Sequence, residues 1–252
     1  MSQLLNAQKK ITAQHFSKAA ERYHNHAHVQ KQAADILIKS LDTDYGVALD
    51  LGCGPFVNSF ELKKRCNTVI SMDLSQAMLQ QQITPSVCAD MDNLPFKNNS
   101  FDLVFSNFAM QWSSNLPALF ESLYTVLKPG GRAHFSLVAD GTLSEMINAF
   151  AAVDSKRHIN QFVSQNDIEA ALKQTAFKRI STSFCHHKVF YETAKEALNS
   201  IKEIGANHKV NSGEKSTGLM GKEKYKTLLA NYKKEQSQFP VSYHVAYIVI
   251  EK

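Results

Sequence analysis

The sequence predicts an α/β fold built on a doubly wound, seven-stranded and mostly parallel sheet. Over residues 46–138, short apolar runs alternate with segments of helical periodicity, the pattern of strands joined by crossover helices. The first apolar run ends in Gly52-Cys53-Gly54-Pro55, a tight turn that follows a buried strand. The second and third runs each end in an aspartate, so three successive strands finish beside an acidic residue.

Five strands are expected in this region, at 47–51, 68–72, 86–89, 101–106 and 132–138. Ser75 follows the second strand and predicts the start of a helix, because a serine hydroxyl caps free backbone N–H groups. Leucines and other apolar residues at helical spacing predict a further helix from 116 to 127, which stops at the Lys-Pro-Gly-Gly segment 128–131.

Helices flank this region on both sides. Two are expected before it, at 8–22 and 27–41, and four after it, at 142–152, 165–174, 193–204 and 220–235, together with strands at 178–190 and 241–250. The division of the chain that follows is an N-terminal helical cap over 1–45, an α/β core over 46–190, a helical lysine-rich lid insertion over 191–238, and the final strand of the core sheet over 239–252.

The composition excludes several classes of protein. The chain has 252 residues, of which 44% are hydrophobic and 20% charged, enough apolar residues for a buried core and too many for wholesale disorder. It lacks the roughly 18 successive apolar residues of a membrane helix, and its first fifteen residues lack the apolar segment of a secretion signal. The four cysteines are widely spaced, against a zinc site or a disulfide scaffold. We therefore expect a cytoplasmic protein.

Positive charge is concentrated in one segment. Residues 195–234 contain nine lysines and four glutamates, with no aspartate or arginine, which accounts for the net charge of +5 of the whole chain. A local excess of lysine attracts acidic partners, although it is also typical of a solvated helix face. A nucleic-acid partner is less expected, because the segment lacks the arginines that favour bidentate contacts to phosphate and guanine.

The turn after the first strand predicts a nucleoside site. Gly52 and Gly54 allow a ligand to approach the backbone closely, and Asp73 lies nineteen residues after Gly54, a spacing that suits a carboxylate on a ribose. A dinucleotide is disfavoured, because Val57 stands where its fingerprint has Gly or Ala and Pro55 has no N–H for a pyrophosphate. The glycine-lysine pattern of a P-loop is absent.

The three aspartates narrow the choice of ligand. Asp50, Asp73 and Asp90 stand at the ends of the first three strands, where they would attract a cation and repel a phosphate. S-adenosylmethionine, which carries adenine, ribose, an ammonium and a sulfonium, meets this description. We therefore expect S-adenosyl-L-methionine as the cofactor.

The same residues resemble the class I S-adenosylmethionine-dependent methyltransferases, which have a Rossmann-like fold. The resemblance covers about 45–138 and rests on five segments in order: ALDLGCGP (48–55), MDLS (72–75), ADMDNLPF (89–96), FDLVFSNFAMQW (101–112) and LKPGG (127–131). It implies that eight residues bind the cofactor. These are Asp50 near the methionine ammonium, Gly52 and Gly54 under the cofactor, Asp73 on the ribose with Leu74 beside it, Asp90 and Met91 around adenine, and Asn107 at the methionine end. One departure is Phe56, where many members have glycine.

More narrowly, the whole chain is similar to the malonyl-[acyl-carrier protein] O-methyltransferases of biotin synthesis. The outer segments carry this resemblance: residues 16–35, 200–208 and 239–244, together with SNFAMQW (106–112). It implies that the enzyme methylates the free carboxylate of a malonyl thioester on an acidic acyl-carrier protein. Docking of that carrier at the lysine-rich lid is expected.

A carboxylate acceptor agrees with the residues present. Such an acceptor is already ionised at neutral pH, so no general base and no certain catalytic residue are expected. A cation would place it, and Lys202 and Arg157 are the candidates, with Lys202 preferred. Four other side chains are suggested to line the substrate pocket, namely Tyr23, Gln111, His208 and His244. The histidines at 24, 26 and 28 are not expected to bind a metal, because only the first and last share a helix face.

Two other functions stay open. One is a methyltransferase for a small molecule, such as a quinone precursor or a free carboxylic acid. The other is a non-catalytic module that binds the cofactor or RNA.

Overall fold

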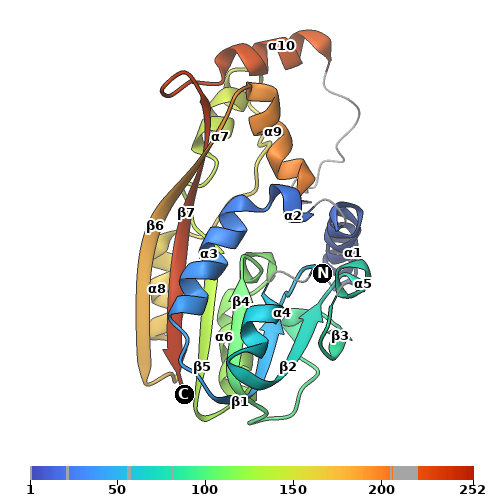
Figure 1. Ribbon diagram of the computed structural model, residues 1–252. Coiled ribbons are helices and arrows are strands. Elements are labelled where there is room, and N and C mark those ends of the chain that lie inside the picture. The colour runs from blue at the N-terminus through green and yellow to red at the C-terminus, as the bar shows by residue number, and fades with distance from the viewer. Residues whose placement is uncertain (1, 21–22, 56–57, 81, 205, 207–220) are drawn as a thin grey trace.

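The computed structural model describes residues 2–20, 23–55, 58–80, 82–204, 206 and 221–252 (Figure 1). A seven-stranded sheet runs through it in the order β3-β2-β1-β4-β5-β7-β6. Strand β7 is antiparallel to both of its neighbours, whereas the pairs among β1 to β5 are parallel. The prediction of a seven-stranded, mostly parallel sheet is confirmed. The strands are β1 (Tyr45–Leu51), β2 (Cys66–Asp73), β3 (Ser86–Cys88), β4 (Phe101–Asn107), β5 (Leu127–Val138), β6 (Arg179–Tyr191) and β7 (Phe239–Glu251).

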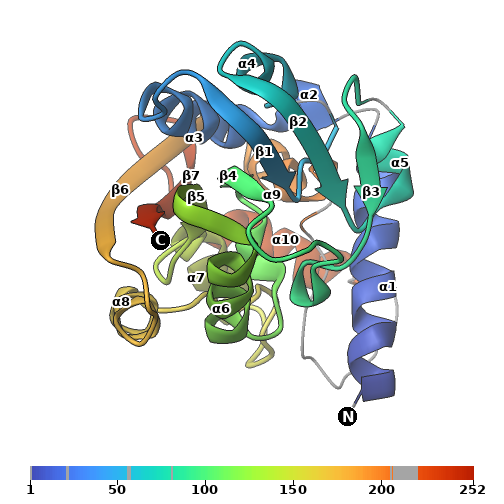
Figure 2. The same cartoon turned by 90° about the horizontal axis from the view of Figure 1, so that it is seen from below.

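Helices cover both faces of the sheet (Figure 2). Helices α3 (His28–Lys39) and α4 (Ser59–Lys63) lie over one face, and α6 (Leu116–Val126) and α8 (Gln165–Lys173) lie over the other. Helix α1 (Ser2–Ala19) stands beside α5 (Gln76–Leu79) at the end where the parallel strands finish. At the far end of the molecule, α9 (Ala194–Glu203) and α10 (Lys222–Asn231) gather with α7 (Ser144–Ala151) near the beginning of β7.

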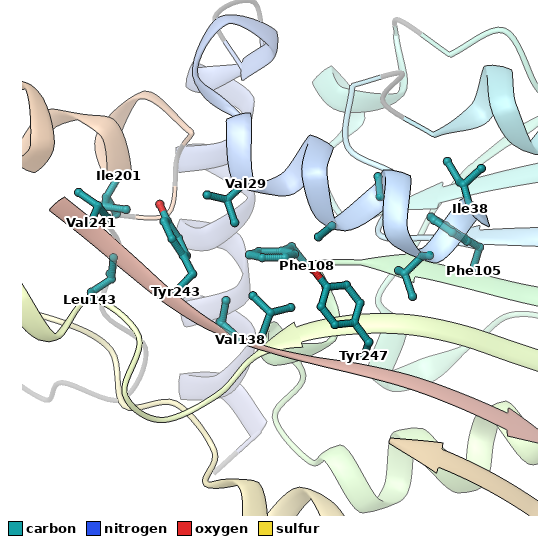
Figure 3. Packing of buried hydrophobic residues seen from close by; sticks show 14 of the residues in the cluster. Val29, Ile38, Phe105, Phe108, Val138, Leu143, Ile201, Val241, Tyr243 and Tyr247 are labelled. Atoms are coloured by element: carbon teal, nitrogen blue, oxygen red, sulfur yellow. The ribbon is translucent and has the colours of Figure 1, made fainter. Parts of the chain in front are cut away.

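Each face of the sheet has its own apolar core. On the α3 side, Leu37 and Phe105 belong to a buried cluster that continues through Val138 and Tyr243 to helix α9 (Figure 3). On the other side, Phe120 of α6 and Phe135 of β5 are almost fully buried, with ring centroids 5.7 Å apart. Burial of apolar area on both faces is the main stabilising contribution in such a fold, at about 25 cal/mol per Å².

The helices predicted after Ser75 and at 220–235 are both present, and the second is shorter than expected. The Ser75 side chain caps α5 by accepting a hydrogen bond from the backbone N–H of Met78, but the helix is only four residues long. The helix expected at 220–235 ends at Asn231, because Tyr232 leaves the helical conformation and buries its ring, with its hydroxyl donating to the Pro240 carbonyl at 2.7 Å.

The N-terminal prediction was wrong in its boundaries. The helix expected at 8–22 is α1, which runs from Ser2 to Ala19, and the helix expected at 27–41 is α3. An additional short helix, α2 (Tyr23–His26), lies between them. Ala27, which separates α2 from α3, is buried and has a ψ of 45°, outside the helical region. This turn between α2 and α3 also places His28 on a different helix from His26.

Among the described residues, no helix has the length and apolar content needed to cross a membrane.

Candidate functional site

A cavity of about 90 Å³ lies where the parallel strands end. Its walls come from the glycine turn after β1, the ends of β2 and β4, the 3₁₀ turns at Met91–Asn93 and Met110–Trp112, and helix α1. We call it the donor cavity. Seven of the eight predicted cofactor residues line it: Gly52, Gly54, Asp73, Leu74, Asp90, Met91 and Asn107.

The glycine turn brings bare backbone to the cavity wall. Gly52 has φ +66°, and a Cβ on it would lie 2.2 Å from the Cβ of Ala109. Gly54 has φ +57°, with open space where its Cβ would be. Both positions therefore require glycine, the first for packing and backbone conformation and the second for conformation. The N–H groups of Gly52 and Cys53 donate to the Met72 carbonyl, which ties the turn to β2.

Asp73 connects the turn to the strand beside it. Its Oδ2 accepts from the Gly54 N–H at 3.0 Å, and its Oδ1 accepts from the Ser75 N–H at 2.8 Å. Burial raises the pKa of Asp73, and these backbone N–H groups offset part of that rise. Because each carboxylate oxygen accepts two hydrogen bonds, both keep capacity for the hydroxyls of a ribose.

Asp50 belongs to β1, two positions before Gly52, and is not among the described residues that line the cavity. Its side chain is fully buried, and neither oxygen accepts a hydrogen bond from the described part of the chain. Burial raises the pKa of Asp50 to about 7, the negative charge of Asp73 adds to the rise, and the nearby side chains of Asn58 and Ser59 offset part of it. A buried carboxylate without a partner fits a site that receives a cation.

The adenine end of the predicted site is closed by helix α1. Asp90 caps the following turn through a hydrogen bond from the Asp92 N–H, and its Oδ2 lies 2.5 Å from the Lys9 Nζ. Lys9 also contacts Asp92 Oδ2 at 2.6 Å. The sequence predicts an N-terminal helical cap over 1–45, but it did not single out Lys9 or any other residue of α1 as part of this site.

Asn107 ends β4, and both ends of its side-chain amide form a hydrogen bond. Its Oδ1 accepts from the Ser136 hydroxyl at 2.7 Å, and its Nδ2 donates to the Gln30 carbonyl at 2.8 Å. This fixes the position of α3 against the end of β4. Asn107 therefore shapes the wall between the donor cavity and its neighbour.

A second cavity, of about 320 Å³, adjoins the first, and we call it the acceptor cavity. The two share a wall made by Phe16, Tyr23, Gln30, Phe108 and Trp112. Figure 3 shows Phe108 between α3 and β7, with Val138 and Tyr243 beside it and Leu143 and Ile201 farther along, beyond Tyr243. Those four residues also line the acceptor cavity, so much of its surface is apolar.

Three of the predicted substrate residues line the acceptor cavity: Tyr23, Gln111 and Arg157. Burial raises the pKa of the Tyr23 phenol, and the charge of Asp73 raises it further, so the phenol stays protonated at neutral pH. Gln111 donates to the Phe108 carbonyl, while its Oε1 is buried without a partner in the described chain. Arg157 donates to Gln161 Oε1 at 3.0 Å and stays exposed.

The structure does not bring Lys202 or His244 to either cavity. Lys202 is exposed on the last turn of α9. His244 follows Tyr243 along β7, and because successive strand residues point to opposite faces, its ring turns away from the acceptor cavity and stacks on His186 at 4.3 Å. The predicted residue His208 and the unusual Phe56 lie outside the described residues.

Comparisons with known proteins indicate that the chain is an enzyme that transfers a chemical group. Residues 49–135 match the family model described as a methyltransferase domain. The chain is 32% identical to a malonyl-[acyl-carrier protein] O-methyltransferase of Salmonella typhimurium, over 97% of this chain and 98% of that protein. It is 35% identical to a biotin biosynthesis bifunctional protein BioHC of Cellvibrio japonicus, over 97% of this chain and 50% of that protein.

The chain thus spans about half the length of the bifunctional relative and nearly all of the single-function one. Among solved structures, the YcgJ protein of Bacillus subtilis has a TM-score of 0.62 at 14% identity, covering 88% of this chain and 98% of that one, which shows a shared fold. Identity of 32% along almost the whole length of both proteins is the stronger finding. This chain belongs to the malonyl-[acyl-carrier protein] O-methyltransferase family.

Proposed function

We propose that this chain transfers the methyl group of S-adenosylmethionine to the free carboxylate of a malonyl thioester on an acyl-carrier protein, an early step of biotin synthesis in the cytoplasm. The observation that carries the proposal is the pair of adjoining cavities with one shared wall. A methyl donor in the first and a carboxylate in the second would meet at Tyr23 and Phe108. The relatives named for this activity support the choice of acceptor.

The donor cavity fits a cationic adenosyl ligand better than a phosphorylated one. Asp73 and Asp90 line it, and Asp50 is buried in β1 just before the glycine turn. Lys9 is the one basic residue among the described residues that line the cavity, and it already forms ion pairs with Asp90 and Asp92. A phosphate would therefore find carboxylates and no available cation, whereas a cationic ligand would be attracted by the acidic residues in and near the cavity.

S-adenosylmethionine supplies an activated methyl group and its leaving group when bound, so the protein's task is to bind, align and exclude water. Asp73 would accept the ribose hydroxyls, while Asp90 and Met91 would border the adenine. Phe108 and Trp112, in the shared wall, would keep water from the line between donor and acceptor.

The acceptor side requires no general base, because a carboxylate with a reference pKa of about 4 is ionised at neutral pH. Arg157 is the basic residue among the described residues that line the acceptor cavity, and it would hold the negative charge of the substrate. The Tyr23 phenol would donate a hydrogen bond to the carboxylate at the shared wall. Apolar residues such as Ile201 and Ile204 would cover the pantetheine arm.

The carrier protein would dock on the lysine-rich lid. Helix α10 presents Lys222, Lys224 and Lys226 on an exposed surface, and Lys233 follows just beyond it. Lys224 lies 3.3 Å from Asp154 and Lys226 lies 3.0 Å from Glu223, so their charges are partly balanced within the chain. Lys222 and Lys233 are exposed as well and would meet the acidic carrier directly.

A transfer assay with methyl-labelled donor tests the proposal. Purified protein is incubated with malonyl-carrier protein, with free malonic acid and with acetyl-carrier protein, which lacks the free carboxylate. Label is expected in a base-labile methyl ester on malonyl-carrier protein alone. Faster labelling of malonic acid would favour a small-molecule methyltransferase, and donor binding without labelling of any acceptor would favour a non-catalytic module.

A further inference from the structure

We propose that Gln82 is a positioning residue that holds the glycine turn in the conformation the methyl donor requires, an inference that rests on the proposed function. Gln82 lies in the segment between α5 and β3 and is half-buried. It is not among the described residues that line either cavity. Its influence on the donor therefore has to pass through the residues that it contacts.

The first contact is with the glycine turn itself. The Gln82 Nε2 donates to the Gly54 carbonyl at 2.6 Å. The Gly54 N–H is held by Asp73 at 3.0 Å, so both polar backbone groups of this residue are fixed by side chains. Gly54 has φ +57° and no side chain that could pack against its surroundings. These two hydrogen bonds therefore hold its backbone in place.

The other end of the same amide reaches two further elements. The Gln82 Oε1 accepts from the Ser59 hydroxyl at 2.5 Å and from the Ser71 hydroxyl at 3.3 Å. Ser59 is the first residue of α4, directly after the turn, and Ser71 belongs to β2. One side chain thus joins the glycine turn, the helix after it and the strand beneath it.

The orientation of the amide follows from its partners. A carbonyl oxygen only accepts hydrogen bonds, so the Gly54 carbonyl must face the NH₂ group, whereas the two serine hydroxyls can serve either end. A carboxylate at position 82 would keep the serine contacts but place an oxygen against the Gly54 carbonyl. An ammonium would keep the bond to Gly54 and lose the acceptor for the serines.

This difference gives a test that separates positioning from folding. The dissociation constants of S-adenosylmethionine and S-adenosylhomocysteine are measured by calorimetry for wild type, Gln82→Glu and Gln82→Lys, with melting temperatures for each. Gln80→Glu, an exposed neighbour, is the matched control for the added charge. We expect a tenfold or greater loss of donor affinity for Gln82→Glu, less than threefold for Gln82→Lys, and none for Gln80→Glu.

Steady-state kinetics complete the test. Gln82→Glu is expected to raise KM for the donor while kcat at saturating donor and KM for the acceptor stay near wild type, since the acceptor cavity does not contact Gln82. Affinity of Gln82→Glu within twofold of wild type, or an equal loss for Gln82→Lys, would overturn the inference. If the wild-type chain itself bound no donor, the proposed function would fail first and this role with it.

Discussion

The Nζ of Lys9 lies 2.5 Å from the Oδ2 of Asp90, so helix α1 is joined by an ion pair to a carboxylate of the donor cavity. Lys9 is only 15% exposed and also contacts Asp92. Two further contacts hold the same helix over the cavity: the Ser17 and Ser75 hydroxyls are 2.8 Å apart, and the rings of Phe16 and Trp112 meet edge to face at 5.3 Å. The donor cavity is therefore completed by the N-terminal helix.

Replacing Lys9 should weaken the packing of helix α1 against the donor cavity. Lys9→Met leaves Asp90 and Asp92 without their cation, and we expect the free energy of unfolding to fall by about 1–2 kcal/mol at low salt. Lys10→Met, one residue along and exposed, should change it by less than about 0.5 kcal/mol. Urea unfolding measures both, and added salt should narrow the difference. Equal stabilities for the two variants would contradict the role of Lys9.

The ion pairs of Lys9 with Asp90 and Asp92 stabilise the fold within a defined pH range. Burial alone would lower the pKa of Lys9, but Asp90 and Asp92 outweigh it and raise that pKa above 10.5. Burial alone would raise the pKa of Asp92, but Lys9, Ser113 and Ser114 lower it below 3.8. The stability from this contact is therefore present between these two values and is lost in strong acid and strong base.

Asp50 should make stability fall as pH rises, the opposite of an ordinary aspartate. Its pKa is about 7 in the folded chain, whereas the ordinary value for an aspartate is about 3.8, so the folded state holds a proton that the unfolded state has lost across this interval. Asp50→Asn, which is neutral and similar in shape, should be more stable than wild type at pH 8 by about 1–3 kcal/mol and similar at pH 4. Urea unfolding across this pH range measures the difference, and a constant difference between the variants would refute the assignment.

Asp73→Ala should weaken donor binding, by on the order of 1–3 kcal/mol for lost charge-assisted hydrogen bonds. The control is Asp102→Ala, because Asp102 begins β4 at the opposite end of the sheet, where it accepts from the Val47 N–H and pairs with Lys128. Asp102→Ala should lose stability and keep its affinity for the donor. Calorimetric titration of both variants is the measurement, and unchanged affinity of Asp73→Ala would remove that residue from the ribose.

Arg157→Gln should impair the acceptor alone. Arg157 lines the acceptor cavity, so removing its charge is expected to raise KM for the malonyl thioester by on the order of tenfold while donor affinity stays the same. Lys202→Gln, at an exposed position outside both cavities, is the matched control and should have little effect. A larger effect of Lys202→Gln would contradict this prediction. It would favour Lys202 as the residue that binds the substrate carboxylate, as expected from the sequence.

Reversing the charge of the lid should affect only the carrier-bound substrate. Lys222, Lys226 and Lys233 changed together to Glu should raise KM for malonyl-carrier protein by on the order of tenfold at low salt. A short malonyl-pantetheine thioester should react as with wild type. Lys224 is left unchanged because its contact with Asp154 holds the loop that carries Arg157. Equal effects on the two substrates would argue against docking at the lid.

The strands of the parallel sheet and the glycine turn on the donor side could be predicted from the sequence because their signals are local. Each parallel strand is a short apolar run, and the residues that follow it define the edge at which a ligand binds. Gly52, Gly54 and Asp73 therefore fall where their spacing indicates, and all three line one cavity. Asp50 belongs to the same segment, but the sequence did not show that its side chain is fully buried and absent from the cavity lining.

The acceptor side depends on contacts between distant segments, which local patterns do not encode. Arg157 comes from the loop after α7, Gln111 from the turn after β4 and Tyr23 from α2, and only the tertiary fold brings them to one cavity. Lys202 was preferred from the sequence because it lies in a distinctive segment, yet it occupies the exposed side of α9. Gln82 gave no signal at all, since its three partners lie 11 to 28 positions away.

The most direct test of the account is a calorimetric titration of the wild-type chain with S-adenosylmethionine and, separately, with NAD at the same concentrations. The buried Asp50, the Asp73 carboxylate in the cavity wall and the paired Lys9 predict saturable binding of the sulfonium donor and negligible binding of the pyrophosphate ligand. Absence of binding by the donor, or NAD bound as tightly, would contradict the assignment of the cavity and everything built on it.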